Sequence, residues 1–427
     1  MNTGLILTLI AFVFVAYSLL TGKIAPSVAS GIAMCFLWLS GVVTEKEVFA
    51  NFISGNIIVM IGMMVVIAAL LKTSILHHIA NIVRKAKGNS VHLVLFIGMF
   101  VPFILCHFIG GVTAMITVIP LMMALADEVG IAPTRVVAPV SVGAQAGLLC
   151  LPIGGGAAQF LTFNQMAANV GNPEQFGFWD FCLTRLPATL VVMAFVMFFG
   201  YKLLPERGLK NTEALDHRLD VLKKSELPRW KEIAAYVIFG GSLVLMIFSR
   251  QMHISMSLIA SVAAFLCVML GILNEREMYR SVNWPLVFMM AFILSMSTAL
   301  NNSGAGDLIA RAFTGVFQMK SNFAIVAVIF LVLAAMTQIM DNTALVNIFA
   351  PIAMIACLQN NVSMLPVVAA VRASTLVSFC TPLASPSSLM AYNLGGYSMK
   401  EMMKFNLPCV LISAVISILW IPIYFAL

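Results

Sequence analysis

The residues best suited to bind a ligand lie together at Asp341, Asn342 and Thr343, inside an otherwise apolar stretch. A carboxylate, an amide and a hydroxyl side by side can coordinate a cation, carry a proton or hydrogen-bond an anion. Further along come Arg372 and then the run from Thr381 to Ser388, where prolines and small residues interrupt the apolar pattern. This grouping of scarce polar side chains at helix-breaking residues predicts one half of a transport site.

The composition determines the setting of these residues. The chain has 427 residues, of which 61% are hydrophobic and 10% charged, whereas about a quarter of the residues of a soluble domain are charged. Many apolar runs approach the roughly 20 residues that span a bilayer, and such runs have to be helical because lipid offers the backbone no partner. The sequence therefore predicts an all-α polytopic membrane protein.

Apolar runs predict membrane spans near residues 3–20, 24–43, 56–71, 180–200, 231–249, 254–272, 284–300 and 403–426. Two composite regions, 91–168 and 321–394, are apolar but interrupted by Gly, Pro, Ser and Thr. Each predicts a re-entrant helical hairpin (91–127 and 321–358) and then a crossing broken in its middle (134–168 and 366–394). The polar segment 201–232 predicts a connector between two halves.

A shift of 230 residues aligns features of the two halves, which indicates an internal duplication. The matched pairs include Gly41 with Gly271, Glu45 with Glu275, Thr113 with Thr343, and Pro152 with Pro382. Five crossings in each half make the second repeat inverted relative to the first. We expect a first repeat at 1–200, with scaffold helices in 1–90 and a last helix at 180–200. The second repeat is expected at 233–427, with scaffold helices in 233–300 and a last helix at 403–426.

The positions of the 24 lysines and arginines predict the orientation. Most fall in the connector and in loops on its side of the membrane, which places the connector 201–232 in the cytoplasm and both termini outside, in the cell (inner) membrane. Arg185 is counted among the few outside residues, and Arg372 lies within a crossing. Because the net charge of +7 sits in short loops, it does not indicate a nucleic-acid partner.

Several function classes lack their motifs. None of the eight cysteines shows CxxC spacing, so neither a zinc site nor a disulfide scaffold is predicted. No P-loop, nucleophile elbow, zinc-protease motif or dinucleotide fingerprint occurs. The sequence predicts no enzyme and no cofactor other than a coupling ion.

Both hairpin tips and both helix breaks are expected to meet near the middle of the membrane, where free helix N-termini suit anions and unwound carbonyls suit Na⁺. The substrate candidates are Gly111, Thr113, Gly154, Gly155, Gly156, Asn342, Thr343, Arg372, Ser385, Ser387 and Ser388. The cation candidates are Asp341, Asn342, Thr343, Gly110, Thr113, Gly154, Thr381 and Ala384.

An ionised Asp341 at the bilayer centre costs about 2.5–3.5 kcal/mol, so it needs a cation, a proton or Arg372 as its partner. Arg372 either holds an anionic substrate or pairs with Asp341. His107, Gln145, Gln159 and Asn164 are either ligands or partners in hydrogen bonds between helices.

The sequence resembles the ion transporter superfamily, most closely the divalent anion:sodium symporter (DASS) family of di- and tricarboxylate and sulfate carriers. Asn342 and Thr343 match the Ser-Asn-Thr hairpin tip of that family, although Asp341 stands where the family has Ser. Ser385-Pro386 resembles the Thr-Pro of its second break, with Ser388 in place of Asn. At the first tip only Thr113 matches, and the first break retains the glycines 154–156 without the Thr-Pro-Pro-Asn signature. The Asp-Asn pair also resembles arsenite pumps and Na⁺/H⁺ antiporters of the superfamily.

The resemblance implies two inverted five-helix repeats, tips that bind Na⁺ and substrate carboxylates, and a homodimer that works as an elevator. Together with the residues, it predicts a secondary transporter that imports a small organic anion, such as a dicarboxylate, with Na⁺ or H⁺. The alternatives are a Na⁺/H⁺ antiporter or a metalloid-anion extruder with Asp341 as proton carrier, and, third, a channel. The expected partners are the anion and the lipid bilayer.

Overall fold

The computed structural model describes residues 3–21, 23–75, 77–78, 81, 90–152, 156, 159–210, 227–249, 251–305, 308, 321–338, 342–381 and 385–426. The helices of the first half are α1 (Thr3–Thr21), α2 (Pro26–Leu39), α3 (Glu45–Phe52), α4 (Gly55–Leu71), α6 (Val91–Ile109), α7 (Gly111–Val129), α8 (Thr134–Gly147), α9 (Gln159–Asn169), α10 (Asp180–Phe198) and the short η2 (Gly200–Leu203). Those of the second half are α12 (Arg229–Ile247), α13 (Met256–Met269), α14 (Glu275–Ser281), α15 (Trp284–Ser303), α18 (Asn322–Met336), α19 (Asn342–Gln359), α20 (Met364–Thr375), α21 (Pro386–Gly395) and α22 (Met399–Tyr424).

The regular elements of the described residues are all helical, without a strand. Six of these helices are long and apolar enough to cross a membrane, or seven when α14 and α15, bent by 53°, count as one span. Shorter apolar helices, among them α13, α18 and α20, complete the set. The prediction of an all-α polytopic membrane protein is confirmed.

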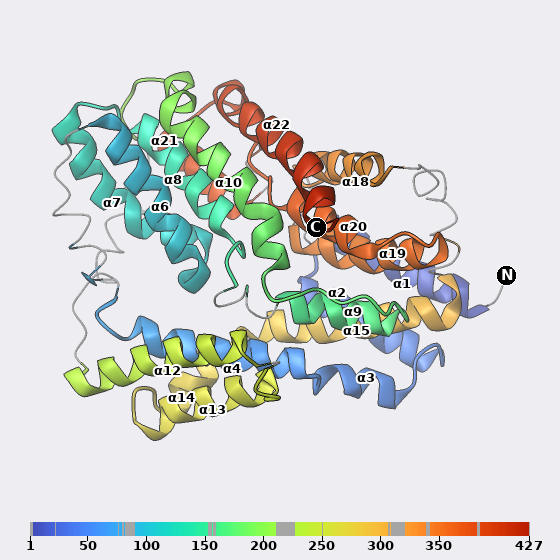
Figure 1. The fold of residues 1–427 in the computed structure, drawn as a ribbon. Coiled ribbons are helices and arrows are strands. Elements are labelled where there is room, and N and C mark those ends of the chain that lie inside the picture. The colour runs from blue at the N-terminus through green and yellow to red at the C-terminus, as the bar shows by residue number, and fades with distance from the viewer. Residues whose placement is uncertain are drawn as a thin grey trace.

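In one layer of the molecule, helices of the first half of the chain pack against helices of the second half. In it α4 packs along α13 and α2 packs along α15 (Figure 1). The first of these pairs is close because Gly62 has no side chain: a Cβ there would lie 2.7 Å from the carbonyl oxygen of Ala260. Small residues let helix backbones approach in this way within lipid. We call α1–α4 with α12–α15 the scaffold layer.

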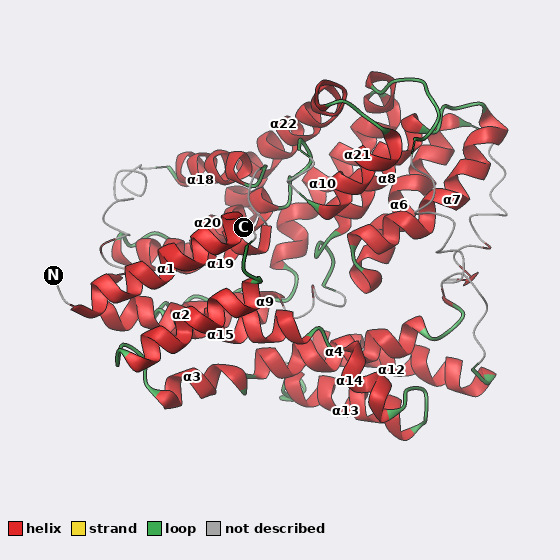
Figure 2. Cartoon of the chain, turned by 180° about the vertical axis from the view of Figure 1, so that it is seen from behind, coloured by secondary structure: helices red, strands yellow, loops and turns green. Residues whose placement is uncertain are grey.

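The hairpins, broken crossings and last helices form the second layer. The hairpin α6–α7 packs against α8, and α18 and α19 pack against α20 (Figure 2). Gly143 and Gly147 put one face of α8 directly on the backbone of α6, because a Cβ at either glycine would overlap a carbonyl oxygen, that of Met99 or Phe103. α21 packs against α7 and α8, and α10 packs along α22. We call this the transport layer.

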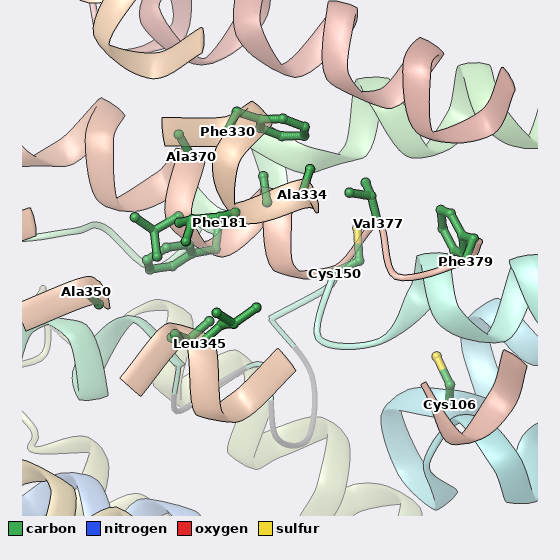
Figure 3. Packing of buried hydrophobic residues seen from close by; sticks show 14 of the residues in the cluster. Cys106, Cys150, Phe181, Phe330, Ala334, Leu345, Ala350, Ala370, Val377 and Phe379 are labelled. Carbon is green, nitrogen blue, oxygen red and sulfur yellow. The ribbon is translucent and has the colours of Figure 1, made fainter. Parts of the chain in front are cut away.

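Buried apolar side chains from different elements form one core, which extends from the transport layer into α1, α2 and α15 of the scaffold layer. Phe181 of α10, Phe330 of α18 and Leu345 of α19 are almost inaccessible and belong to one cluster (Figure 3). The same cluster includes Cys150 and Val377, which follow α8 and α20 respectively. The ends of the two broken crossings are therefore held by one common core.

Structural details recur at the 230-residue shift found in the sequence. α3 and α14 each begin with a reciprocal capping box, formed by Thr44 with Glu47 and by Asn274 with Glu277. The packing of α2 on α15 has its counterpart in that of α13 on α4, and the packing of α6 on α8 in that of α18 on α20. The inversion of one repeat relative to the other remains a prediction.

The hairpins and breaks begin and end close to the predicted residues: α6–α7 covers 91–129 and α18–α19 covers 322–359. α12 begins at Arg229 rather than 233, and α22 at Met399 rather than 403. Much of the predicted connector, residues 211–226, lies outside the described residues. The division into domains therefore stays a prediction.

The two layers meet where α19 packs against α1 and along α9. This helix packs against α15 and α4 of the scaffold layer and against α19 of the transport layer, and it lies between them in Figure 1. Asn169, at its C-terminal end, donates hydrogen bonds to Asn51 of α3 (3.3 Å) and to the carbonyl of Leu294 of α15 (2.9 Å). At the first tip, the rings of Phe108 and Phe239 of α12 are 5.6 Å apart.

Candidate functional site

Two hairpin tips and two helix breaks supply the candidate site. The first tip turns at Gly110, whose φ of 77° lies in the left-handed region that only glycine adopts without strain. The second tip lies between α18 and α19; Thr337 and Gln338 are described there, whereas 339–341 are not. The first break separates α8 from α9 and the second separates α20 from α21.

The structure brings these four elements together. A Cβ at Gly111 would lie 2.7 Å from Ser387 Oγ, so the first tip rests on the start of α21. Gln145 Nε2 at the end of α8 donates to Ser378 Oγ in the second break, at 2.7 Å. Asn342 Nδ2 of the second tip donates to the same oxygen at 2.9 Å. Ser378 thereby joins the first break, the second tip and the second break. The sequence did not indicate Ser378 as a candidate residue.

Side chains shape the second break from several directions. Four backbone carbonyls there each accept a side-chain hydrogen bond: Val377 from Gln338, Ser378 from Ser388, Phe379 from Asn406, and Cys380 from Tyr392. The donors come from α22, from α21 and from the residues that follow α18. The Val377 carbonyl also accepts from the Phe379 amide, whereas the other carbonyl oxygens have a second lone pair, so the break is preorganised by protein and can still accept a further contact.

Several candidate residues have structural partners. Thr381 donates its hydroxyl to the carbonyl of Gln338, and Asn342 Oδ1 accepts from Thr337. Ser385 caps α21 by accepting from the Ser388 amide at 3.2 Å. The Cα of Gly156 lies so close to the Leu151 carbonyl that a Cβ would overlap its oxygen.

Other candidates are placed only by position or lie outside the description. Thr113 and Thr343 lie in the first turns of α7 and α19 and are half-buried. Asp341, Gly154, Gly155 and Ala384 lie outside the described residues. That any of the candidate residues binds a substrate or a cation stays a prediction.

The sequence left open whether four polar residues bind a ligand or hold helices together. All four form hydrogen bonds with residues outside their own helix. His107 Nε2 accepts from the Leu151 amide at 2.9 Å, which leaves Nδ1 as the protonated nitrogen beside the Ile104 carbonyl. Gln145 contacts Ser378, Gln159 contacts Arg372, and Asn164 bonds the backbone of Phe176. These contacts favour a structural role for these residues.

Arg372 of α20 is buried, with 7% of its surface exposed. Its Nε donates to Gln159 Oε1 at 3.2 Å, so its guanidinium lies between the second broken crossing and the start of α9. The three ion pairs among the described residues join Lys72 with Glu277, Arg135 with Glu206, and Arg207 with Glu401. Within that part of the chain, Arg372 therefore has no carboxylate in range.

Arg185 is a second buried arginine, and its predicted position in an outside loop is wrong. Arg185 lies within α10 and is 7% exposed. Its guanidinium donates to the carbonyls of Gln145 (3.1 Å) and Leu148, where α8 ends. A cation at a helix C-terminus satisfies carbonyls that lack a partner in the helix. The predicted span 180–200 already contained this arginine, and a charge inside a span is the signal that was missed.

The described residues contain no group of three or more His, Cys, Asp or Glu side chains that could hold a metal ion. All eight cysteines are free, and all but Cys35 are buried. The arrangement offers hydroxyls, amides, helix N-termini and a guanidinium, which together suit a small anion better than a tightly bound transition metal.

Comparison with known proteins places the chain among membrane transporters. The family model described as "Citrate transporter" (CitMHS) matches residues 9–376. The uncharacterized transporter YfbS of Escherichia coli is 25% identical over 169 residues, which cover 38% of this chain and 27% of YfbS. The uncharacterized transporter Mb2703 of Mycobacterium bovis is 24% identical over 323 residues, which cover 73% of this chain and 71% of Mb2703.

The name of a third relative includes a substrate. The "probable sodium/sulfate cotransporter 3" of Chlamydomonas reinhardtii is 25% identical over 150 residues, which cover 35% of this chain and 17% of that protein. The matched region spans only about a quarter to a third of the length of the first curated relatives, such as YfbS at 27%.

Two solved transporters share the fold. The YdaH transporter of Alcanivorax borkumensis has a TM-score of 0.63 at 15% identity, over 89% of this chain and 88% of YdaH. MtrF of Neisseria gonorrhoeae has a TM-score of 0.62 at 14% identity, over 89% and 83%. The predicted kinship with the ion transporter superfamily is confirmed, and the chain belongs to the citrate transporter family.

Proposed function

We propose that this chain is a secondary active transporter that imports citrate or a similar small carboxylate, coupled to Na⁺ or H⁺. The observation that carries the proposal is the buried guanidinium of Arg372, which has no carboxylate in ion-pair range among the described residues. An uncompensated buried charge is unfavourable, and a carboxylate substrate would neutralise it with charge-assisted hydrogen bonds. The family description and the sodium/sulfate relative support an anion and a sodium ion.

The site around Arg372 supports alternating access. Both hairpin tips and both breaks meet within the transport layer, which contacts the scaffold layer through α9 and through the packing of α19 on α1. A body that carries the whole site and packs against a separate layer of helices is suited to slide as an elevator. We further propose a homodimer in the cell membrane, with both termini outside and the connector in the cytoplasm.

Uptake by purified protein in proteoliposomes tests the proposal. Labelled citrate, succinate and sulfate are offered with an inward Na⁺ gradient, a proton gradient, or neither. We expect saturable uptake of a carboxylate that depends on one of the gradients. Linear, non-saturable flux would instead indicate a channel.

Asp341→Asn tests the coupling ion. This substitution is expected to abolish gradient-driven uptake while leaving the protein folded, because it removes the carboxylate that meets the cation or proton. Wild-type uptake with unchanged ion dependence would exclude Asp341 from coupling. If Na⁺ dissipates a pH gradient without any organic anion, the protein is an antiporter and the symport proposal fails.

A further inference from the structure

A cavity of about 750 Å³ with a mixed polar and apolar lining opens between α9 and the scaffold layer, apart from the hairpin tips and breaks. Its walls are the start of α4, the loop between α12 and α13, and one face of α9. Because α4, α12 and α13 contribute only their ends, the cavity lies at the rim of the scaffold layer, where spans meet water. Its size falls within the roughly 300–1,000 Å³ of small-molecule pockets.

Two buried polar side chains in the cavity wall lack a partner. Asn56, the second residue of α4, is 8% exposed, and Ser249, just after α12, is 5% exposed. Among the described residues, no hydrogen bond is formed by either side chain, although both face the cavity. Both polar groups line the cavity, so each is free to hydrogen-bond water or a ligand oxygen there.

The rest of the lining indicates what such a ligand would be. Other polar groups of the wall are already engaged: Asn164 with the Phe176 backbone and Gln165 with Asn169. Among the residues that the structure describes, the lining contains amides, hydroxyls and His253 but neither a carboxylate nor a lysine or arginine. It therefore lacks the acidic ligands that a hard cation requires and offers neutral hydrogen-bond donors to an anion that keeps part of its hydration shell.

The start of α9 links the cavity lining with Arg372. α9 begins at Gln159, whose side chain accepts from Arg372, and the next two residues, Phe160 and Leu161, line the cavity. Phe160 is 3% exposed, and its ring lies 5.6 Å from that of Phe178. Along α9, the apolar Phe160 and Leu161 thus follow directly on the residue that bonds Arg372.

We propose that this cavity is an access vestibule, in which a hydrated carboxylate binds weakly to Asn56 and Ser249 before it reaches Arg372. The proposal rests on the proposed anion transport and adds a second, outer binding step to it. α9 is both the wall of the vestibule and the bridge between the layers, so its displacement relative to α4 would open the route past Phe160.

Uptake kinetics provide the first test. In proteoliposomes, Asn56→Ala and Ser249→Ala should each raise the apparent KM for citrate about 3- to 10-fold, because each removes about one hydrogen bond to the anion. The kcat should stay unchanged. Ser40→Ala is the control, because the Ser40 hydroxyl only bonds Leu37 of its own helix. A double variant with the wild-type KM would overturn the vestibule while leaving the transport function intact.

Thiol labelling provides a second test that does not depend on transport. Asn56→Cys should react with a negatively charged, membrane-impermeant methanethiosulfonate, and citrate should slow the reaction. The unsubstituted protein supplies the background from Cys35, the one exposed native cysteine. Failure of the reagent to reach position 56 from either side of the membrane, or a rate indifferent to citrate, would refute the proposal. Absence of citrate uptake by the wild type would instead count against the proposed function.

Discussion

Arg372→Gln separates the two roles that the sequence left open for this arginine. Glutamine is shorter and uncharged but can still contact Gln159, so it removes the charge with little change of volume. If Arg372 binds the substrate, the variant should lose affinity for the anion and keep its stability. If Arg372 is instead the structural partner of Asp341, the variant should lose stability.

The structure sets the size of both effects. Arg372 uses its Nε for Gln159, which leaves its two terminal nitrogens for a carboxylate. Charge-assisted hydrogen bonds contribute about 1.5–3 kcal/mol each, so losing two weakens binding by about 3 kcal/mol or more, roughly 100-fold. By contrast, removing one partner of a buried ion pair costs about 3–5 kcal/mol of stability, or roughly 3–6 °C in the melting temperature of a chain of this length.

The assay is thermal unfolding of the purified protein with and without citrate, because a ligand that binds the folded state raises its melting temperature. We expect the ligand-free variant to melt at or above the wild-type temperature and to have lost the shift caused by citrate. Arg185→Gln is the matched control: its guanidinium serves the carbonyls of Gln145 and Leu148, so this change should lower stability by about 1–3 kcal/mol. A ligand-free Arg372→Gln protein destabilised as strongly as the control, or an undiminished citrate shift, would refute the reasoning.

Three further substitutions test the packing around the site. Gly147→Ala forces a Cβ against the Phe103 carbonyl and should cost about 1–3 kcal/mol of stability, whereas Gly240→Ala, with no atom within 4 Å, should be neutral in the same thermal assay. Gln338→Ala removes the donor to Val377 and the acceptor for the Cys380 amide; a loss of about 1–3 kcal/mol is expected, and an unchanged melting temperature would mean that other groups hold the break. Asn169→Ala removes the hydrogen bonds from α9 to the scaffold layer and should speed citrate counterflow; slower counterflow would show that these bonds assist the motion.

The positions of the hairpins and breaks could be read from the sequence because they follow from local chemistry. Apolar runs have to be helical in lipid, and Gly110 marks a turn because its φ of 77° excludes other residues. The end of α20 before the run that leads to Pro386 is equally local, since a proline is favoured at the start of a new helix.

The contacts within the site could not be predicted in the same way. Gln145 and Ser378 are 233 residues apart in the chain, and neither residue type indicates the other. Arg185 carried a signal, a charge inside an apolar span, but its partners are backbone carbonyls, which every residue possesses. Asn406 is likewise identified only by its bond to the Phe379 carbonyl.

The sequence by itself determined the membrane setting, the helical class, the two hairpins and the polar tip at Asn342 and Thr343, because each depends on hydrophobicity, backbone freedom or residue type over a short stretch. Only the tertiary structure decided that Ser378 joins three of the four elements and that Arg372 reaches the start of α9. It also placed the cavity lined by Asn56 and Ser249 against α9. These features arise from close packing between distant segments, which depends on how whole helices fit together rather than on any local pattern.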